Sequence, residues 1–278
     1  IFVLESIGDI DFEATVLSNR GLACQQNGDI NSSLKNYLQS LSLLLSNKKE
    51  LPYYLFNNIG IIYLEIGNYH TALKYFNYAL KIEDKRNNIL EQAYTIANIG
   101  RTYLYMEDFS NAITYLGEAK IIMKKFGDRQ AESQVFSNLG KAHLKMRCFP
   151  DGIKFFNKSL KYYREIGDTS SVGHTLCELG ELHFELNDFV TSKKYFYESL
   201  EVSSEIHDEI NEARVYMGFG RLYTRFHDID KANNFLEKAV ALAEKRSSYK
   251  ELGRIYKLQY DSFMAVGESK DAKNYLTK

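Results

Sequence analysis

Six glycines recur along this chain at an almost constant interval, and no other feature constrains the fold as strongly. They are Gly21, Gly60, Gly100, Gly140, Gly180 and Gly220, separated by 39 residues once and by 40 residues thereafter. A glycine inside a helix costs roughly 1 kcal/mol relative to alanine. Its regular return therefore predicts a position where two helices approach too closely for a side chain. A fixed period of this length is typical of repeat architectures, in which each unit is one small supersecondary motif.

A pattern of large and small residues accompanies each glycine. In the second unit it consists of Phe56, Gly60, Tyr63, Tyr69, Ala72, Phe76 and Ala79. Spacings of three and four place the large residues on one helical stripe, and segments such as IGNY, MEDF, LNDF and FHDI supply turn residues between two helices. The apolar periodicity runs through each glycine, which argues against a helix C-cap at that position. Each unit is thus predicted to be an antiparallel helix hairpin, and the fold to be all-α.

This pattern resembles the tetratricopeptide repeat, in its large residue, Leu-Gly, aromatic and small-residue positions. The phrase FGDRQAESQVFSNLG, from Phe126 to Gly140, is similar to the long-repeat branch found in Pins/LGN-type polarity scaffolds, kinesin light chains and bacterial TPR regulators and sensors. The resemblance implies a right-handed superhelical solenoid of about seven stacked hairpins.

The repeats predict one solenoid that spans residues 1–278. The expected units are 14–47, 53–86, 93–126, 133–166, 173–206, 213–246 and an incomplete unit at 253–278, with 1–12 as the tail of a preceding repeat. Terminal repeats usually carry a polar cap, and neither end clearly supplies one. We therefore expect a fragment of a larger protein, with a possible attached effector domain and possible end-to-end self-association.

Composition excludes several classes of function. With 35 basic and 36 acidic residues, the chain has no net charge that would attract nucleic acid or an acidic membrane. Three scattered cysteines without a CxxC pair indicate a reducing compartment, with the cytoplasm as the expected location. No apolar run approaches the ~20 residues that span a bilayer. No phosphate-binding loop, GxSxG or HExxH motif occurs, so neither an enzyme nor a cofactor is expected.

The family resemblance implies that the first helix of each unit lines a concave wall, through its second, fifth, sixth, ninth, twelfth and thirteenth residues. The sixth position holds Asn19, Asn58, Asn98 and Asn138. A carboxamide both donates and accepts hydrogen bonds, so it can hold the backbone of an extended peptide whatever the peptide's side chains are. The alternative is that these amides bond a neighbouring helix or the turn of their own repeat.

Other candidate groove residues occupy the remaining inward positions. They are Tyr54, Tyr94, Ile61, Leu64, Leu104, Tyr105, Arg101 and Lys141. An exposed apolar groove usually has a partner. The alternative is that the apolar members pack between helices.

The C-terminal half carries two weaker signals. Arg214, Arg221 and Arg225 form a possible anion site, although alternating charges at these positions favour neutralisation between repeats. His174, Cys177 and Glu178 share one helical face at a spacing compatible with a metal, but ordinary groove lining is the favoured interpretation and no metal is expected. His143 and His183 stand where other units have tyrosine, so packing explains them.

These observations favour a non-catalytic module that binds a peptide or protein segment and forms the sensory or regulatory part of a larger signalling protein. The alternative is a constitutive scaffold that assembles a complex or associates through its own ends.

Overall fold

The computed structural model describes residues 9–246, 248–265 and 267, and the predicted helix tail at the N-terminus lies largely outside them. The described residues form thirteen helices and no strand. They divide into two compact units, Ile1–Ala142 and His143–Lys278, which are described separately.

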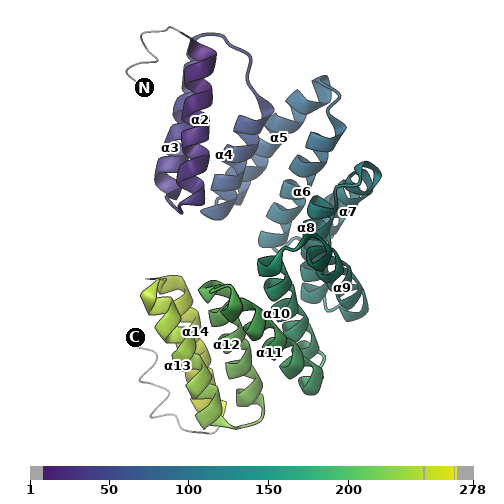
Figure 1. The fold of residues 1–278 in the computed structure, drawn as a ribbon, viewed down its shortest axis with the longest axis vertical. Coiled ribbons are helices and arrows are strands. Elements are labelled where there is room, and N and C mark those ends of the chain that lie inside the picture. The colour runs from purple at the N-terminus through teal and green to yellow at the C-terminus, as the bar shows by residue number, and fades with distance from the viewer. Residues whose placement is uncertain (1–8, 247, 266, 268–278) are drawn as a thin grey trace. The chain divides into compact units, whose positions relative to one another are not determined.

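The first unit contains three helix hairpins and most of a further helix (Figure 1). Its helices are α2 (Ile10–Gln26), α3 (Ile30–Ser46), α4 (Tyr53–Glu65), α5 (Tyr69–Lys85), α6 (Ile89–Tyr105), α7 (Phe109–Phe126) and α8 (Arg129–Lys145), the last of which ends beyond the unit boundary. Each helix from α2 to α6 packs on the next, and the first helices α4 and α6 also touch.

The second unit repeats this arrangement. Its helices are α9 (Phe149–Ile166), α10 (Thr169–Glu185), α11 (Phe189–Glu205), α12 (Glu209–Arg225), α13 (Ile229–Lys245) and α14 (Tyr249–Ala265). Consecutive helices pack together, and the first helices α10, α12 and α14 form a continuous layer. The prediction of an all-α fold of stacked antiparallel hairpins is confirmed.

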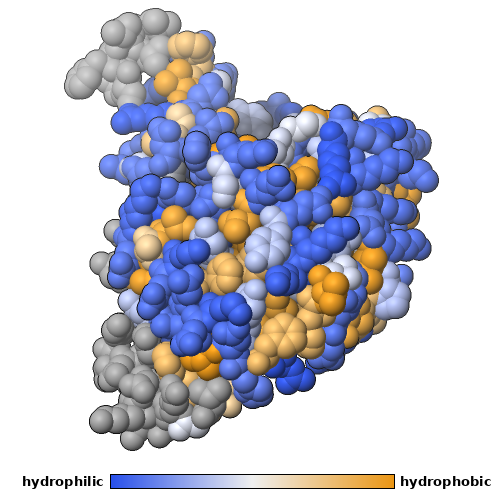
Figure 2. All heavy atoms as spheres, turned by 60° about the horizontal axis from the view of Figure 1, so that its bottom comes forward, coloured by the Kyte–Doolittle hydropathy of each residue, from blue (hydrophilic) through white to orange (hydrophobic). Residues whose placement is uncertain are grey.

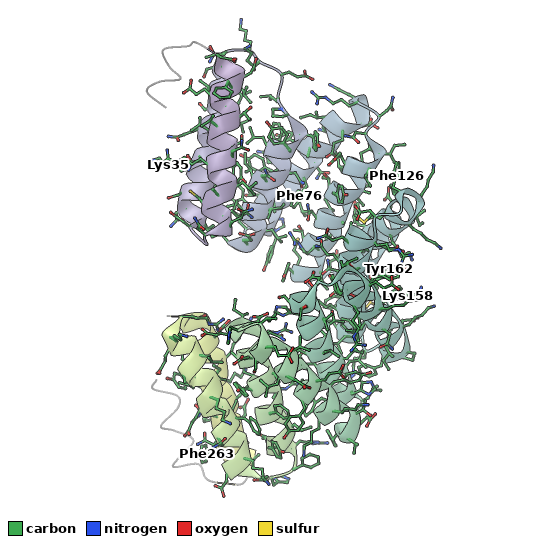
Figure 3. All side chains as sticks on the ribbon, viewed as in Figure 1. Lys35, Phe76, Phe126, Lys158, Tyr162 and Phe263 are labelled. Carbon is green, nitrogen blue, oxygen red and sulfur yellow. The ribbon has the colours of Figure 1, made fainter. Side chains whose placement is uncertain are left out.

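The repeated glycines lie where the sequence places them, against the second helix of the hairpin. A Cβ atom on Gly60 would lie 2.6 Å from Phe76 Cε1, and one on Gly180 would lie 2.6 Å from Phe196 Cδ1. Both phenylalanine side chains are buried, and Figure 3 labels Phe76 among the helices of the first unit. The close approach of the two helices therefore explains the glycine.

Side-chain caps fix where the helices begin. Asp9, Asp168 and Asp208, each twelve residues before a repeated glycine, accept a hydrogen bond from the backbone N–H three residues on. This is the usual N-cap arrangement, which satisfies a backbone donor that the helix itself cannot use.

Candidate functional site

A polar hollow of about 150 Å³ lies between α6 and α8 in the first unit. It is lined by Tyr94, Ala97, Asn98 and Arg101 of α6, Met123 of α7, and Ala131, Gln134, Val135 and Asn138 of α8. We call it the α6–α8 hollow. Figure 2 shows a face on which hydrophilic residues cover most of the surface and apolar residues form smaller groups. The lining of the hollow combines polar side chains with the apolar side chains of Ala97, Met123, Ala131 and Val135.

The four predicted groove asparagines differ in whether their side chains form hydrogen bonds within the protein. Asn98 Nδ2 donates to Asn57 Oδ1 of α4 at 3.0 Å. This is a bond to a neighbouring helix, the alternative to peptide binding that the sequence analysis considered. The side chains of Asn19, Asn58 and Asn138 form no hydrogen bond with the described residues. Most of the hydrogen-bonding capacity of these amides is thus available to a ligand.

Tyr94 is fixed at the edge of the hollow by Asp128, which precedes α8. The Tyr94 hydroxyl donates to Asp128 Oδ2, while Asp128 Oδ1 accepts from the Ala131 backbone N–H at 2.9 Å. This hydrogen bond, together with burial, raises the pKa of Tyr94 to about 12. The phenol is therefore neutral at physiological pH, and both oxygens of Asp128 are engaged.

Arg101 is the one charged side chain that lines the hollow. Its Nε atom is buried and has no hydrogen-bond partner, and the guanidinium forms no ion pair with any described residue. Burial lowers the pKa of Arg101, against the opposing influence of Tyr105 and Glu65. An arginine remains protonated under such conditions, so the hollow holds a half-buried positive charge that forms no ion pair with a described residue.

Four of the predicted groove residues thus meet in the hollow: Tyr94, Asn98, Arg101 and Asn138. The other predicted residues do not line it. Those with substantial exposure or partial burial are Asn19, Asn58, Tyr54, Ile61, Leu104, Tyr105 and Lys141. Tyr105 is 56% exposed and stacks on Tyr69 with ring centroids 6.2 Å apart.

Leu64 is a correction to the predicted site. Its side chain is only 6% exposed and belongs to the core cluster around Ala72, Phe76 and Ile99. Ile61 packs against the same cluster. For Leu64, packing between helices is the correct interpretation, whereas Ile61 is only partly buried and stays a predicted groove residue.

The sequence analysis missed five residues of the hollow, namely Ala97, Met123, Ala131, Gln134 and Val135. Two of them carried a usable signal: Ala97 and Gln134 occupy the fifth and second positions of their units, both expected to face inward. Met123 belongs to a second helix, so a search confined to first helices could not find it.

In the second unit, the charged positions neutralise one another. Arg214 Nη2 lies 2.8 Å from Glu178 Oε1 and 3.9 Å from Glu181 Oε1, and Arg221 Nη2 lies 2.8 Å from Glu185 Oε1. Burial raises the pKa of Glu181. Burial alone would lower the pKa of Arg214, but the acidic groups around it raise it overall. The predicted pairing between repeats therefore holds for Arg214 and Arg221, which argues against an anion site there.

Three histidines of the second unit also have structural roles. His174 Nε2 lies 3.1 Å from Asp208 Oδ2, while His143 stacks on Phe155 and His183 packs against Tyr195. No group of three or more His, Cys, Asp or Glu residues in the described part of the chain is arranged to hold a metal ion. Nor does the described part contain a helix with the length and apolar character required to cross a bilayer.

Comparisons with known proteins agree with this architecture. The tetratricopeptide repeat family model matches residues 12–85 and 171–245, which together exceed half of the chain. None of the curated proteins matches the chain.

Several solved structures share the fold. The apo form of RapI is 14% identical, with a TM-score of 0.77 and 95% of both chains covered. The Rap conjugation gene regulator of plasmid pLS20, in complex with the Phr* peptide, is 15% identical with a TM-score of 0.76, covering 98% of this chain and 74% of that one. NprR in complex with its cognate peptide NprX is 16% identical with a TM-score of 0.72, covering 97% and 76%. At these identities the likeness shows the fold alone.

Proposed function

Because this chain belongs to the tetratricopeptide repeat family, we propose that it is a non-catalytic module that binds an extended peptide across the first helices of its first unit. The α6–α8 hollow is the centre of this site. The peptide would be the input of a cytoplasmic regulatory protein, with any output carried by an attached effector domain. The whole chain would act as one repeat solenoid.

The observation that carries this proposal is the pair of amides at Asn98 and Asn138. They occupy the same position of consecutive repeats and line one hollow. Asn138 has its full hydrogen-bonding capacity available, and Asn98 uses one donor. Helices that pack 8–10 Å apart present such amides at about every third residue of an extended strand, which rises ~3.3 Å per residue. Binding of peptides by the similarly folded NprR and pLS20 Rap proteins supports the proposal by analogy.

The test is selection from a random octapeptide library, followed by affinity measurement on the enriched sequences. We expect the double variant Asn98→Ala/Asn138→Ala to bind these peptides roughly 5- to 150-fold more weakly, because each of the two lost hydrogen bonds contributes about 0.5–1.5 kcal/mol.

The matched control is Asn77→Ala. Asn77 is an exposed asparagine on α5, the second helix of its hairpin, and it bonds only to the Leu73 carbonyl. This variant should bind like the original protein. Peptides that bind the double variant with undiminished affinity would contradict the proposed site, and a library that yields no enriched peptide would contradict peptide binding.

A further inference from the structure

The repeat places a second arginine, Arg221, at the position that corresponds to Arg101, and there the protein supplies a carboxylate as counterion. Arg221 lies 120 residues further on, three repeat lengths away, at the same position of its unit. It is paired with Glu185, 36 residues before it, at 2.8 Å, and its guanidinium lies 4.6 Å from the centroid of the Phe184 ring.

In the first unit the corresponding ion pair is not formed. Glu65 stands 36 residues before Arg101, as Glu185 does before Arg221. Glu65 Oε1 instead accepts a hydrogen bond from Gln25 Nε2 of the preceding repeat at 2.9 Å. Arg101 is left with a buried Nε atom that has no partner. A buried donor without a hydrogen-bond partner destabilises the protein, so Arg101 gains more from an incoming acceptor than the already paired Arg221 does.

No other carboxylate in the described part of the chain forms an ion pair with Arg101. Asp128, which closes the same region through Tyr94, already accepts bonds on both of its oxygens. Tyr105 and Glu65 act on the pKa of Arg101 only through their charge. The groups that line the hollow beside Arg101 are amides, a phenol and apolar side chains, none of which can neutralise a guanidinium.

We propose that Arg101 binds a carboxylate of the incoming peptide, with Asn98 and Asn138 holding the adjoining peptide backbone. A guanidinium and a carboxylate form short, charge-assisted and often bidentate hydrogen bonds. This inference rests on the proposed function, because the carboxylate belongs to the same ligand. The carboxylate comes either from an acidic side chain or from the C-terminus of the peptide.

The first test observes Arg101 directly. The Nε–Hε resonance of Arg101, assigned by its absence in Arg101→Lys, is followed by NMR during titration with three small probes. N-acetyl-aspartate amide carries a side-chain carboxylate, N-acetyl-glycylglycine carries a terminal carboxylate, and N-acetyl-asparagine amide carries neither. The proposal is supported if one acid moves the resonance saturably while the amide, and sodium chloride of equal ionic strength, leave it in place. The acid that moves it then identifies whether the carboxylate comes from a side chain or from the C-terminus. No difference between acids and amide would overturn it.

The second test separates this inference from the proposed function. The library is repeated without Asp and Glu and with an amidated C-terminus, and the enriched acidic peptides are measured on Arg101→Gln. We expect the acid-free library to lose enrichment and Arg101→Gln to bind acidic peptides at least about tenfold more weakly. Arg221→Gln, at the paired counterpart, should leave affinity unchanged. Equal enrichment from both libraries would overturn the carboxylate inference while leaving peptide binding intact, and failure of both libraries would overturn peptide binding itself.

Discussion

At the scale of single residues, Glu83 is an acidic side chain that the fold buries. It is fully buried at the end of α5, at a position where the other repeats have Leu44, Met123, Tyr163, Ser203 and Ala243. Thr95 Oγ1 donates to Glu83 Oε1 at 2.9 Å, and Oε2 has no partner. Burial raises the pKa of Glu83 from 4.5 to about 7, and the nearby Glu91 adds to this effect.

This shift predicts a pH dependence of stability. Between pH 4.5 and 7 the folded state holds a proton on Glu83 that the unfolded state releases, so stability falls as pH rises through this window and then levels off. The loss should be about 3 kcal/mol, because the difference between a pKa of 4.5 and one of about 7 corresponds to ~1.4 kcal/mol for each pH unit. Urea unfolding at a series of pH values should therefore give a flatter profile for Glu83→Gln over this range. A profile unchanged by the substitution would show that Glu83 does not titrate in this way.

At the scale of elements, the hairpin turns share one strained position. The residue after the C-cap of each first helix has a positive φ, which glycine adopts easily, as at Gly67 (φ 83°). Glu107 and Asn187 occupy the same turn position with φ 62° and 59°. A side chain other than Asn or Asp loses about 1–2 kcal/mol in this left-handed conformation.

We therefore expect Glu107→Gly to stabilise the protein by about 0.5–1 kcal/mol, less than the full strain because glycine also frees the unfolded chain. Asn187→Gly should give a smaller gain, since asparagine tolerates the left-handed region. The midpoints of urea unfolding measure both effects. A larger gain at Asn187 than at Glu107 would show that strain in the turn is not the cause.

At the scale of the whole molecule, stability in a repeat protein is divided among neighbouring hairpins rather than held in one core. Gly60→Ala forces a methyl group into the Phe76 ring, and such overpacking costs about 1–3 kcal/mol. Hydrogen exchange should then accelerate in α4–α6 of the first unit and stay unchanged in α11–α13 of the second. Gly180→Ala, which meets Phe196, should give the opposite distribution.

Gly117→Ala is the matched control, because Gly117 lies within α7 and no atom outside its own backbone surroundings lies within 4 Å of an added Cβ. This variant should gain up to about 1 kcal/mol from helix propensity alone. Uniform acceleration of exchange in both units by Gly60→Ala would contradict local stability.

The sequence by itself determined the parts of this protein that depend on spacing along the chain. The 40-residue interval and the apolar stripes specify helix hairpins, because helix periodicity is a local property. The same regularity placed Asn98, Asn138, Tyr94 and Arg101 on the first helices.

The tertiary structure alone decided which of these side chains share a site. Leu64 and Tyr105 occupy predicted inward positions, yet one is buried in the core and the other is exposed. Arg101 and Arg221 occupy identical positions in their units, yet Arg221 pairs with Glu185 while Glu65, the acid at the matching distance from Arg101, bonds Gln25 instead. A repeat fixes where a residue stands, but the neighbouring helices fix what it touches, and that competition between neighbours cannot be deduced from spacing.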